Sequence, residues 1–175
     1  TLTLSGANTY GGPTTVNGGS IDISGSLNIG AKTMTTTVAS GATFFGSGVL
    51  TANAYTTSGL GTVNLTGLNQ INTASATGTI GSYTLTNGKS LALGSIASNG
   101  VISIHASGAT SDLTLNSGAV ISSSATGNAV LLGAGRNFIN NSGASAVSTA
   151  SGRWLIYSTT PASDTFGSLN SANTA

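Results

Sequence analysis

The side chains of this chain most able to do chemistry are its three carboxylates, Asp22, Asp112 and Asp164; there is no Glu. Hydrolysis of a glycosidic bond requires two carboxyl groups about 5–10 Å apart. The apolar triplets described below recur about every 20 residues, which predicts a helix-like stack of β-strand coils. In such a stack these three Asp residues would lie several coils from one another. The sequence therefore predicts that the chain is not an enzyme, and a polysaccharide-active enzyme is only a remote alternative.

The other reactive residues form no recognisable catalytic or metal-binding pattern. His105 is the single histidine. Because Ser is abundant throughout the chain, a Ser-His-Asp catalytic triad could be assigned to many different residues, so the match carries no information. No G-x-S-x-G motif is present. Cysteine is absent, and three scattered Asp residues cannot supply the six to eight oxygens that Ca²⁺ prefers. The sequence GAGR at 133–136 lacks the ending of a phosphate-binding loop. We expect no catalytic, cofactor-binding or metal residues and no cofactor, and the residues of any binding surface stay unknown.

Two polar patterns are weaker signals. Asn64 and Asn140 each begin a match to the N-glycosylation sequon, which chance alone explains in a chain so rich in Ser and Thr. Whether either is modified is left open. Thr-x-Thr triplets such as Thr33-Met34-Thr35 do not recur once per coil in the sequence, so a flat ice-binding array is not expected.

Charge is scarce, because Asp, Glu, Lys and Arg make up 4% of residues where about 25% is usual, and the net charge is +1. Such a chain has no sustained electrostatic field, which argues against a nucleic-acid partner. At 38% hydrophobic residues it is too apolar for a typical disordered chain.

No stretch approaches the ~20 apolar residues of a membrane span, so we expect no membrane insertion. The chain lacks an initial Met and a leader, which indicates a segment of something longer.

Short triplets with apolar ends and a small or polar centre recur along the chain, and this alternation is typical of strands. Examples are Leu2-Thr3-Leu4, Ile21-Asp22-Ile23, Leu27-Asn28-Ile29, Val63-Asn64-Leu65, Tyr83-Thr84-Leu85, Leu91-Ala92-Leu93, Ile102-Ser103-Ile104 and Leu113-Thr114-Leu115.

The spacing of the triplets separates two all-β architectures. Val63 to Tyr83, Tyr83 to Ile102 and Leu91 to Leu113 are steps of about 20 residues, which suits one coil of a parallel β-helix. An antiparallel sandwich would show longer strands and a turn every 8–12 residues. Stacked coils would bury ladders of Leu, Ile and Val and expose Ser, Thr and Asn, while a repeated charge would sit about 4.8 Å from its copy. We predict a solenoid of roughly eight coils and about 40 Å.

Two stretches resemble known families. Residues 2–21, LTLSGANTYGGPTTVNGGSI, resemble the passenger-associated repeat of autotransporters, whose pattern is L-x-G-x-N-T-Y-x-G-x-T-x-V-x-x-G-x-L. Residues 127–141, GNAVLLGAGRNFINN, and 152–158, GRWLIYS, resemble the end of the β-helical region in filamentous-haemagglutinin-like exoproteins of two-partner secretion. Neither motif is a binding site in these families, so no binding residue carries over.

The resemblance implies an exported, right-handed parallel β-helix in a large surface or released protein of a Gram-negative bacterium. The leading function is a structural or adhesive segment, an adhesin stalk or a matrix filament of the kind found in biofilms. The alternative is a module that binds carbohydrate or a host protein through its outer face. The expected partners are other segments of the same long chain, further copies in a filament or matrix, and a glycan or host-surface ligand. The expected location is extracellular or on the cell surface.

Residues 1–160 are predicted to form the β-helix, and residues 161–175 a tail or the start of another module. The strand at 153–157 is apolar on both faces, with Trp154 and Ile156 on one and Leu155 and Tyr157 on the other. It is predicted to close the C-terminal end, with Trp154 or Tyr157 lying over the last coil; the alternative is an ordinary strand covered by the tail that follows it.

Overall fold

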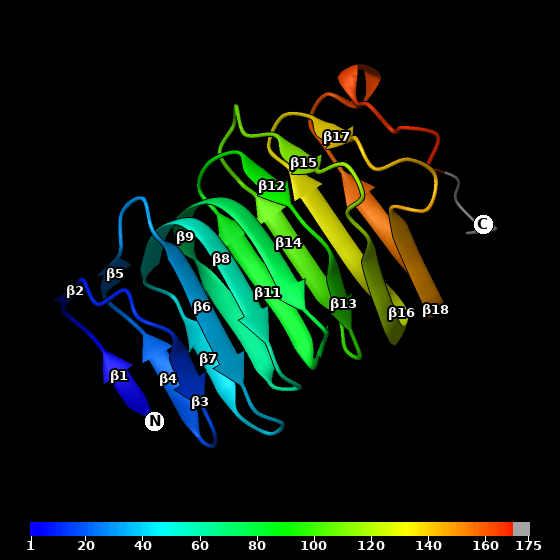
Figure 1. Ribbon diagram of the computed structural model, residues 1–175. Helices are drawn as coiled ribbons and strands as arrows, with labels where there is room; N and C mark the ends of the chain where they lie inside the picture. The colour runs from blue at the N-terminus through cyan, green and yellow to red at the C-terminus, as the bar shows by residue number, and fades with distance from the viewer. Residues whose placement is uncertain (170–175) are drawn as a thin grey trace.

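The computed structural model describes residues 1–169 as a solenoid of stacked strands (Figure 1). Its strands form an 18-stranded sheet, and every pairing between them in the described part of the chain is parallel. The predicted all-β parallel β-helix is therefore confirmed. The strands are β1 (Leu2–Leu4), β2 (Ala7–Asn8), β3 (Thr14–Val16), β4 (Ser20–Ile23), β5 (Ser26–Asn28), β6 (Thr33–Val38), β7 (Thr43–Gly46), β8 (Val49–Ser58), β9 (Thr62–Thr77), β10 (Thr79–Ile80), β11 (Ser82–Asn87), β12 (Leu91–Leu93), β13 (Ile96–Ser98), β14 (Ile102–Ala106), β15 (Leu113–Leu115), β16 (Ile121–Ala134), β17 (Phe138–Asn140) and β18 (Val147–Tyr157).

One column of paired residues runs through the whole solenoid. It consists of Leu2, Ile21, Phe44, Val63, Tyr83, Ile102, Val130 and Trp154, each paired with the next. The two steps predicted from the triplets, Val63 to Tyr83 and Tyr83 to Ile102, are pairs of this column. The third predicted step, Leu91 to Leu113, is a pair between β12 and β15.

The solenoid has about seven turns, where the sequence predicts roughly eight. Up to Ile102 the partners in the column are 19 to 23 residues apart, but Ile102 pairs with Val130 and Val130 with Trp154. The later turns are longer because residues 124–129 of β16 lie between the part paired with β13 and the part paired with β14. A period taken from the regular middle of the chain therefore overestimates the number of turns.

The interior holds the predicted Leu, Ile and Val ladders together with four fully buried aromatic side chains, Phe44, Tyr55, Tyr83 and Phe138. The rings of Phe44 and Tyr55 stack with centroids 6.2 Å apart. The Tyr55 hydroxyl is hydrogen bonded to Thr36 at 2.9 Å, and burial raises the pKa of Tyr55 to about 12. Burial also raises the pKa of Tyr83 well above its ordinary value. Both tyrosines are therefore neutral packing residues.

Not all Ser, Thr and Asn side chains face outward, contrary to the simple inward–outward division expected from the sequence. The buried polar residues are Thr14, Thr36, Thr57, Asn69, Asn87, Ser98, Ser111, Ser123 and Asn140. Asn87 shows the reason. Its Oδ1 accepts a hydrogen bond from the Ile71 N–H at 2.9 Å, and its Nδ2 donates to the Ile71 and Lys89 carbonyl oxygens at 2.9 Å.

Asn69 has the same role one turn earlier. Its Oδ1 accepts from the Leu50 N–H at 2.8 Å, and its Nδ2 donates to the Gly67 carbonyl oxygen at 2.9 Å. A bend interrupts the strand ladder and would leave backbone groups unpaired inside the protein. The buried asparagines supply those missing partners.

The outer surface carries hydrogen bonds between uncharged side chains of neighbouring turns. Examples are Asn72 to Asn53 at 2.9 Å and the hydroxyl pair Thr56–Ser75 at 3.2 Å. Repeating these groups at every turn costs no charge repulsion, in keeping with the low charge of the chain.

β18 places Trp154 and Ile156 against the core, while Tyr157 is 58% exposed. Of the two side chains predicted to cover the last coil, Trp154 thus faces inward and Tyr157 faces solvent.

Beyond β18 lies the 3₁₀ turn Pro161–Ser163. The Thr165 N–H then donates to the Phe138 carbonyl oxygen at 2.9 Å, so this segment stacks on β17. Residues 170–175 of the predicted tail lie outside the described residues.

We predict that Asn87→Ala lowers the free energy of unfolding by about 2–4 kcal/mol, because it leaves buried backbone groups of Ile71 without partners. Urea unfolding followed by circular dichroism measures this change. The control is Asn64→Ala on the exposed side of β9, which should change the free energy by less than about 0.5 kcal/mol. Equal urea midpoints for the two variants would contradict the role given to Asn87.

Candidate functional site

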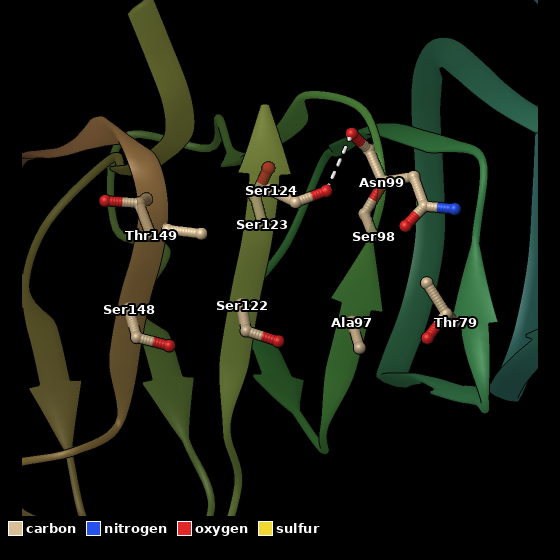
Figure 2. Close-up of a pocket in the computed structure, with 10 residues that line it drawn as sticks. Thr79, Ala97, Ser98, Asn99, Ser122, Ser123, Ser124, Ser148 and Thr149 are labelled. Atoms are coloured by element: carbon tan, nitrogen blue, oxygen red, sulfur yellow. Dashed lines mark hydrogen bonds between the residues drawn. The ribbon is translucent and has the colours of Figure 1, made fainter. Parts of the chain in front are cut away.

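A hollow of about 370 Å³ lies on the outside of the solenoid, across four successive turns (Figure 2). It spans β10, β13, the first part of β16 and the first part of β18. We call it the serine groove, and its lining residues are Thr79, Ala97, Ser98, Asn99, Ser122, Ser123, Ser124, Ser148, Thr149 and Ala150.

The outer row of the serine groove presents available hydroxyl groups. Thr79 pairs with Ala97, Ala97 with Ser122, and Ser122 with Ser148, so these side chains form one line along the solenoid axis (Figure 2). Neighbouring members are about 4.8 Å apart, the spacing of adjacent strands. The hydroxyls of Thr79, Ser122 and Ser148 make no hydrogen bond to the rest of residues 1–169, and they are open to a ligand.

The inner row of the groove is used by the fold itself. Ser98 Oγ donates to the Gly81 carbonyl oxygen at 2.9 Å and accepts from the Gly100 N–H at 3.1 Å. Ser123 Oγ repeats the arrangement one turn later, donating to the Gly100 carbonyl oxygen at 2.8 Å. These two hydroxyl groups are therefore bonded to the backbone and link neighbouring turns.

Sequence reasoning missed the serine groove. The signal that could have found it is a recurring apolar–small–hydroxyl triplet, Ile96-Ala97-Ser98, Ile121-Ser122-Ser123 and Val147-Ser148-Thr149. Its members are further apart than the 20-residue spacing of the other triplets, and Ser is common everywhere in the chain. The triplet is therefore recognisable only once the pairing of β13, β16 and β18 is known.

The groove contains no carboxylate, imidazole, amine or guanidinium among its lining residues. A serine nucleophile needs a neighbouring base to take its proton. The serine groove can therefore accept and donate hydrogen bonds to an uncharged ligand, and it offers no group that activates a hydroxyl.

The three carboxylates are not brought together into one group. Asp22 lies on β4, paired with Thr3 and Phe45. Asp112 and Asp164 lie on the two turns that flank β17. Asp112 accepts a hydrogen bond at 3.2 Å from the N–H of Asn137, which directly precedes β17, and Asp164 accepts one at 2.8 Å from the N–H of Phe138, the first residue of β17. These two residues are thus closer than the several coils predicted, because the last turns are longer than 20 residues.

No group of three or more His, Cys, Asp or Glu side chains that could hold a metal ion occurs in residues 1–169.

Asp112 and Asp164 tie neighbouring turns together. Asp112 forms an ion pair with Arg136, whose Nε donates to Oδ1 at 2.8 Å. The hydrogen bond from Arg136 lowers the pKa of Asp112, and the Asn137 N–H acts in the same direction while burial opposes both. Asp164 accepts hydrogen bonds from the Phe138 N–H and from the Ser158 hydroxyl at 2.7 Å. Both carboxylates are engaged in structural contacts.

The two glycosylation sequons differ in exposure. Asn140 is 2% exposed, and its Nδ2 donates to the Gly143 and Phe166 carbonyl oxygens at 2.8 Å. Asn64 lies on the exposed side of β9. Only Asn64 of this pair presents its amide nitrogen to solvent.

Thr-x-Thr triplets do not recur from turn to turn, as the sequence predicts, but a mixed array of Thr and Ser does occur on the outer face. On three successive turns, Thr33, Thr35 and Thr37 stack on Ala54, Thr56 and Ser58, which stack on Thr73, Ser75 and Thr77. Hydroxyls of neighbouring turns are hydrogen bonded in the pairs Thr37–Ser58 at 3.1 Å and Thr56–Ser75 at 3.2 Å. The array is limited to β6, β8 and β9, and part of its hydrogen-bonding capacity links the turns to each other.

Residues 1–23 match the family model of the passenger-associated-transport-repeat. These residues contain β1, β2, β3 and β4, and β4 returns to pair with β1. One repeat is thus one complete turn of the solenoid plus the strand that closes it. The repeat and the solenoid together fit an autotransporter passenger.

No curated protein and no solved structure matches the chain. A passenger repeat implies a secreted or surface protein. Within residues 1–169, no helix has the length and apolar character to cross a membrane.

We predict that acid weakens the fold through Asp112. Because its pKa is lowered in the folded state, its contribution to stability is complete above the unfolded-state pKa and is lost as the pH falls below about 4. The drop in melting temperature from pH 7 to pH 2 should therefore be smaller in Asp112→Asn and in Arg136→Gln than in the unchanged chain. The double variant should equal the single ones. An identical acid-induced drop in all four proteins would show that the pair does not act this way.

Proposed function

We propose that this chain is a rod segment of an exported bacterial surface protein, with a structural and adhesive role and without catalytic activity. The observation that carries the proposal is the unbroken parallel column from Leu2 to Trp154, which begins in a turn matched by a passenger-associated-transport-repeat.

The physics of the solenoid suits a spacer. A single turn cannot bury its apolar face, so turns add only by stacking on those already present. Seven steps of about 4.8 Å give a rod of about 34 Å from this chain alone. Because each turn contacts only its neighbours, further turns extend the rod without altering its cross-section, which would carry other modules away from a cell.

The adhesive part of the proposal rests on the outer surface. Uncharged hydroxyl and amide groups cover much of it, and the serine groove offers the free hydroxyls of Thr79, Ser122 and Ser148 at successive positions along the axis. This favours a second candidate function, the binding of a neutral polysaccharide laid along the rod. Lateral association of copies into a filament or matrix would use the same uncharged surface.

Two export routes fit the proposal. The repeat at residues 1–23 favours an autotransporter. The resemblance of residues 127–141 and 152–158 to filamentous-haemagglutinin-like proteins favours two-partner secretion. Both deliver a β-helix to the cell surface, so the rod function does not depend on the choice.

The test is display of residues 1–175 in a Gram-negative host, between an export signal and an outer-membrane translocator. We predict that the displayed chain resists added protease and increases attachment of the cells to surfaces coated with neutral polysaccharide. Leu85→Asp places a charge in the core, where Leu85 is fully buried, and should abolish both properties. Asn64→Asp, on the exposed side of β9, is the matched control and should retain them.

Protease resistance without attachment would remove the adhesive role and keep the spacer. Attachment that survives in Leu85→Asp would show that the folded rod is not what binds.

A further inference from the structure

The outer side of β14, β16 and β18, three strands that lie side by side in Figure 1, differs from the hydroxyl-rich surface elsewhere. In one row Ser103 is followed by Leu131 and then Leu155 on the next two turns. In the neighbouring row His105 is followed by Gly133 and then Tyr157. The two rows place apolar and aromatic side chains on an outward face.

Gly133 opens a gap between two rings in the second row. A Cβ atom at Gly133 would lie 2.5 Å from Cδ2 of His105, so the imidazole leans over the glycine. Tyr157 stands on the other side of Gly133 and is 58% exposed. The result is a hollow of about 280 Å³, which we call the aromatic slot; its lining residues are Ser103, Ile104, His105, Leu131, Leu132, Gly133 and Tyr157.

The size and lining of the aromatic slot restrict its ligand. Binding sites for drug-sized molecules span about 300–1,000 Å³, so this slot suits a single ring. No Asp, Glu, Lys or Arg lines it. The side-chain polar atoms of Ser103, His105 and Tyr157 make no hydrogen bond to the rest of the described chain, and they line the same hollow as the apolar side chain of Leu131. A matching ligand has one apolar face and a rim of uncharged polar groups.

We propose that the aromatic slot binds one pyranose ring of a neutral glycan. The C–H face of the sugar packs on the Tyr157 ring and Leu131, and its hydroxyls exchange hydrogen bonds with Ser103 and His105. An aromatic side chain of a protein partner would fill the same space but leave those hydroxyl and imidazole groups without partners, which costs binding free energy.

The proposal does not depend on how the chain continues or on the rod function. Both walls, His105 and Tyr157, lie within the described residues, and a further turn would stack on the far side of Tyr157. A rod that never reaches a cell surface could still bind sugar through this slot, and a rod without sugar binding could still act as a spacer. The slot is therefore tested by titration of the purified chain, and the rod by the protease resistance of the displayed chain.

The experiment uses the purified chain of residues 1–175 and a panel of neutral methyl pyranosides. His105 is the single histidine, so its imidazole proton resonances report on the slot alone. We expect a saturable shift of these resonances with at least one pyranoside and a Kd of about 1–10 mM, since one ring buries little surface. The phenol p-cresol, which mimics a tyrosine side chain, should bind more weakly, with a higher Kd from the concentration dependence of the same shifts.

Two variants remove the slot in different ways. Tyr157→Ala deletes one wall, and Gly133→Ala forces the His105 ring to move, so each should weaken binding at least about tenfold. Tyr10→Ala is the control, because Tyr10 is also an exposed tyrosine and lies in the first turn. It should bind as the unchanged chain does, and thermal unfolding should show that the three variants are folded. If Gly133→Ala does not fold, Tyr157→Ala decides the question.

The proposal is overturned by the absence of a saturable His105 shift with every pyranoside. It is also overturned by a shift that persists unchanged in Tyr157→Ala, or by p-cresol binding more tightly than all the sugars.

Discussion

The structure depends on one constraint: each backbone segment pairs in parallel with the segment one turn away, so equivalent side chains lie about 4.8 Å apart along the whole rod. Whatever occupies a position must tolerate a near copy of itself above and below. Apolar residues meet this condition in the interior, where Val63, Tyr83 and Ile102 follow one another. Hydroxyl and amide groups meet it outside, because they both donate and accept hydrogen bonds. Charged groups do not meet it, which accounts for their being 4% of the chain.

The same constraint explains the exceptions. At a bend the backbone leaves the ladder, and its polar groups need partners from side chains, which Asn69, Asn87 and Ser98 provide from buried positions. The one ion pair found in residues 1–169 joins opposite charges on neighbouring turns, Asp112 and Arg136, so stacking is favourable there. The longer late turns place Gly133 between His105 and Tyr157, and the serine groove extends onto them from Thr79 in the regular part of the solenoid.

Much of the fold is predictable from the sequence, because alternation and period follow directly from stacking. The pairs Val63–Tyr83 and Leu91–Leu113 came from spacing alone. The number of turns did not, since loop lengths vary freely on the surface of a solenoid. The burial of Asn87 and Ser98 was missed because Asn and Ser were expected to face outward, although each continues the inward alternation of its strand after Leu85 and Ile96. The serine groove and the aromatic slot were missed because each unites residues from several turns, and only the register shows which residues are neighbours.

Disulfide cross-linking tests the central claim, the parallel register, most directly. The chain has no cysteine, so any bond formed comes from the introduced pair. Thr84 and Ser103 are partners on adjacent turns, and Asn64 is the partner of Thr84 on the turn before. A disulfide requires Cα atoms less than about 7 Å apart, which adjacent turns satisfy and alternate turns do not. The account predicts that Thr84→Cys/Ser103→Cys and Asn64→Cys/Thr84→Cys form intramolecular disulfides under mild oxidation, while Asn64→Cys/Ser103→Cys stays reduced. Ready oxidation of the Asn64→Cys/Ser103→Cys pair, with the other two left reduced, would contradict it.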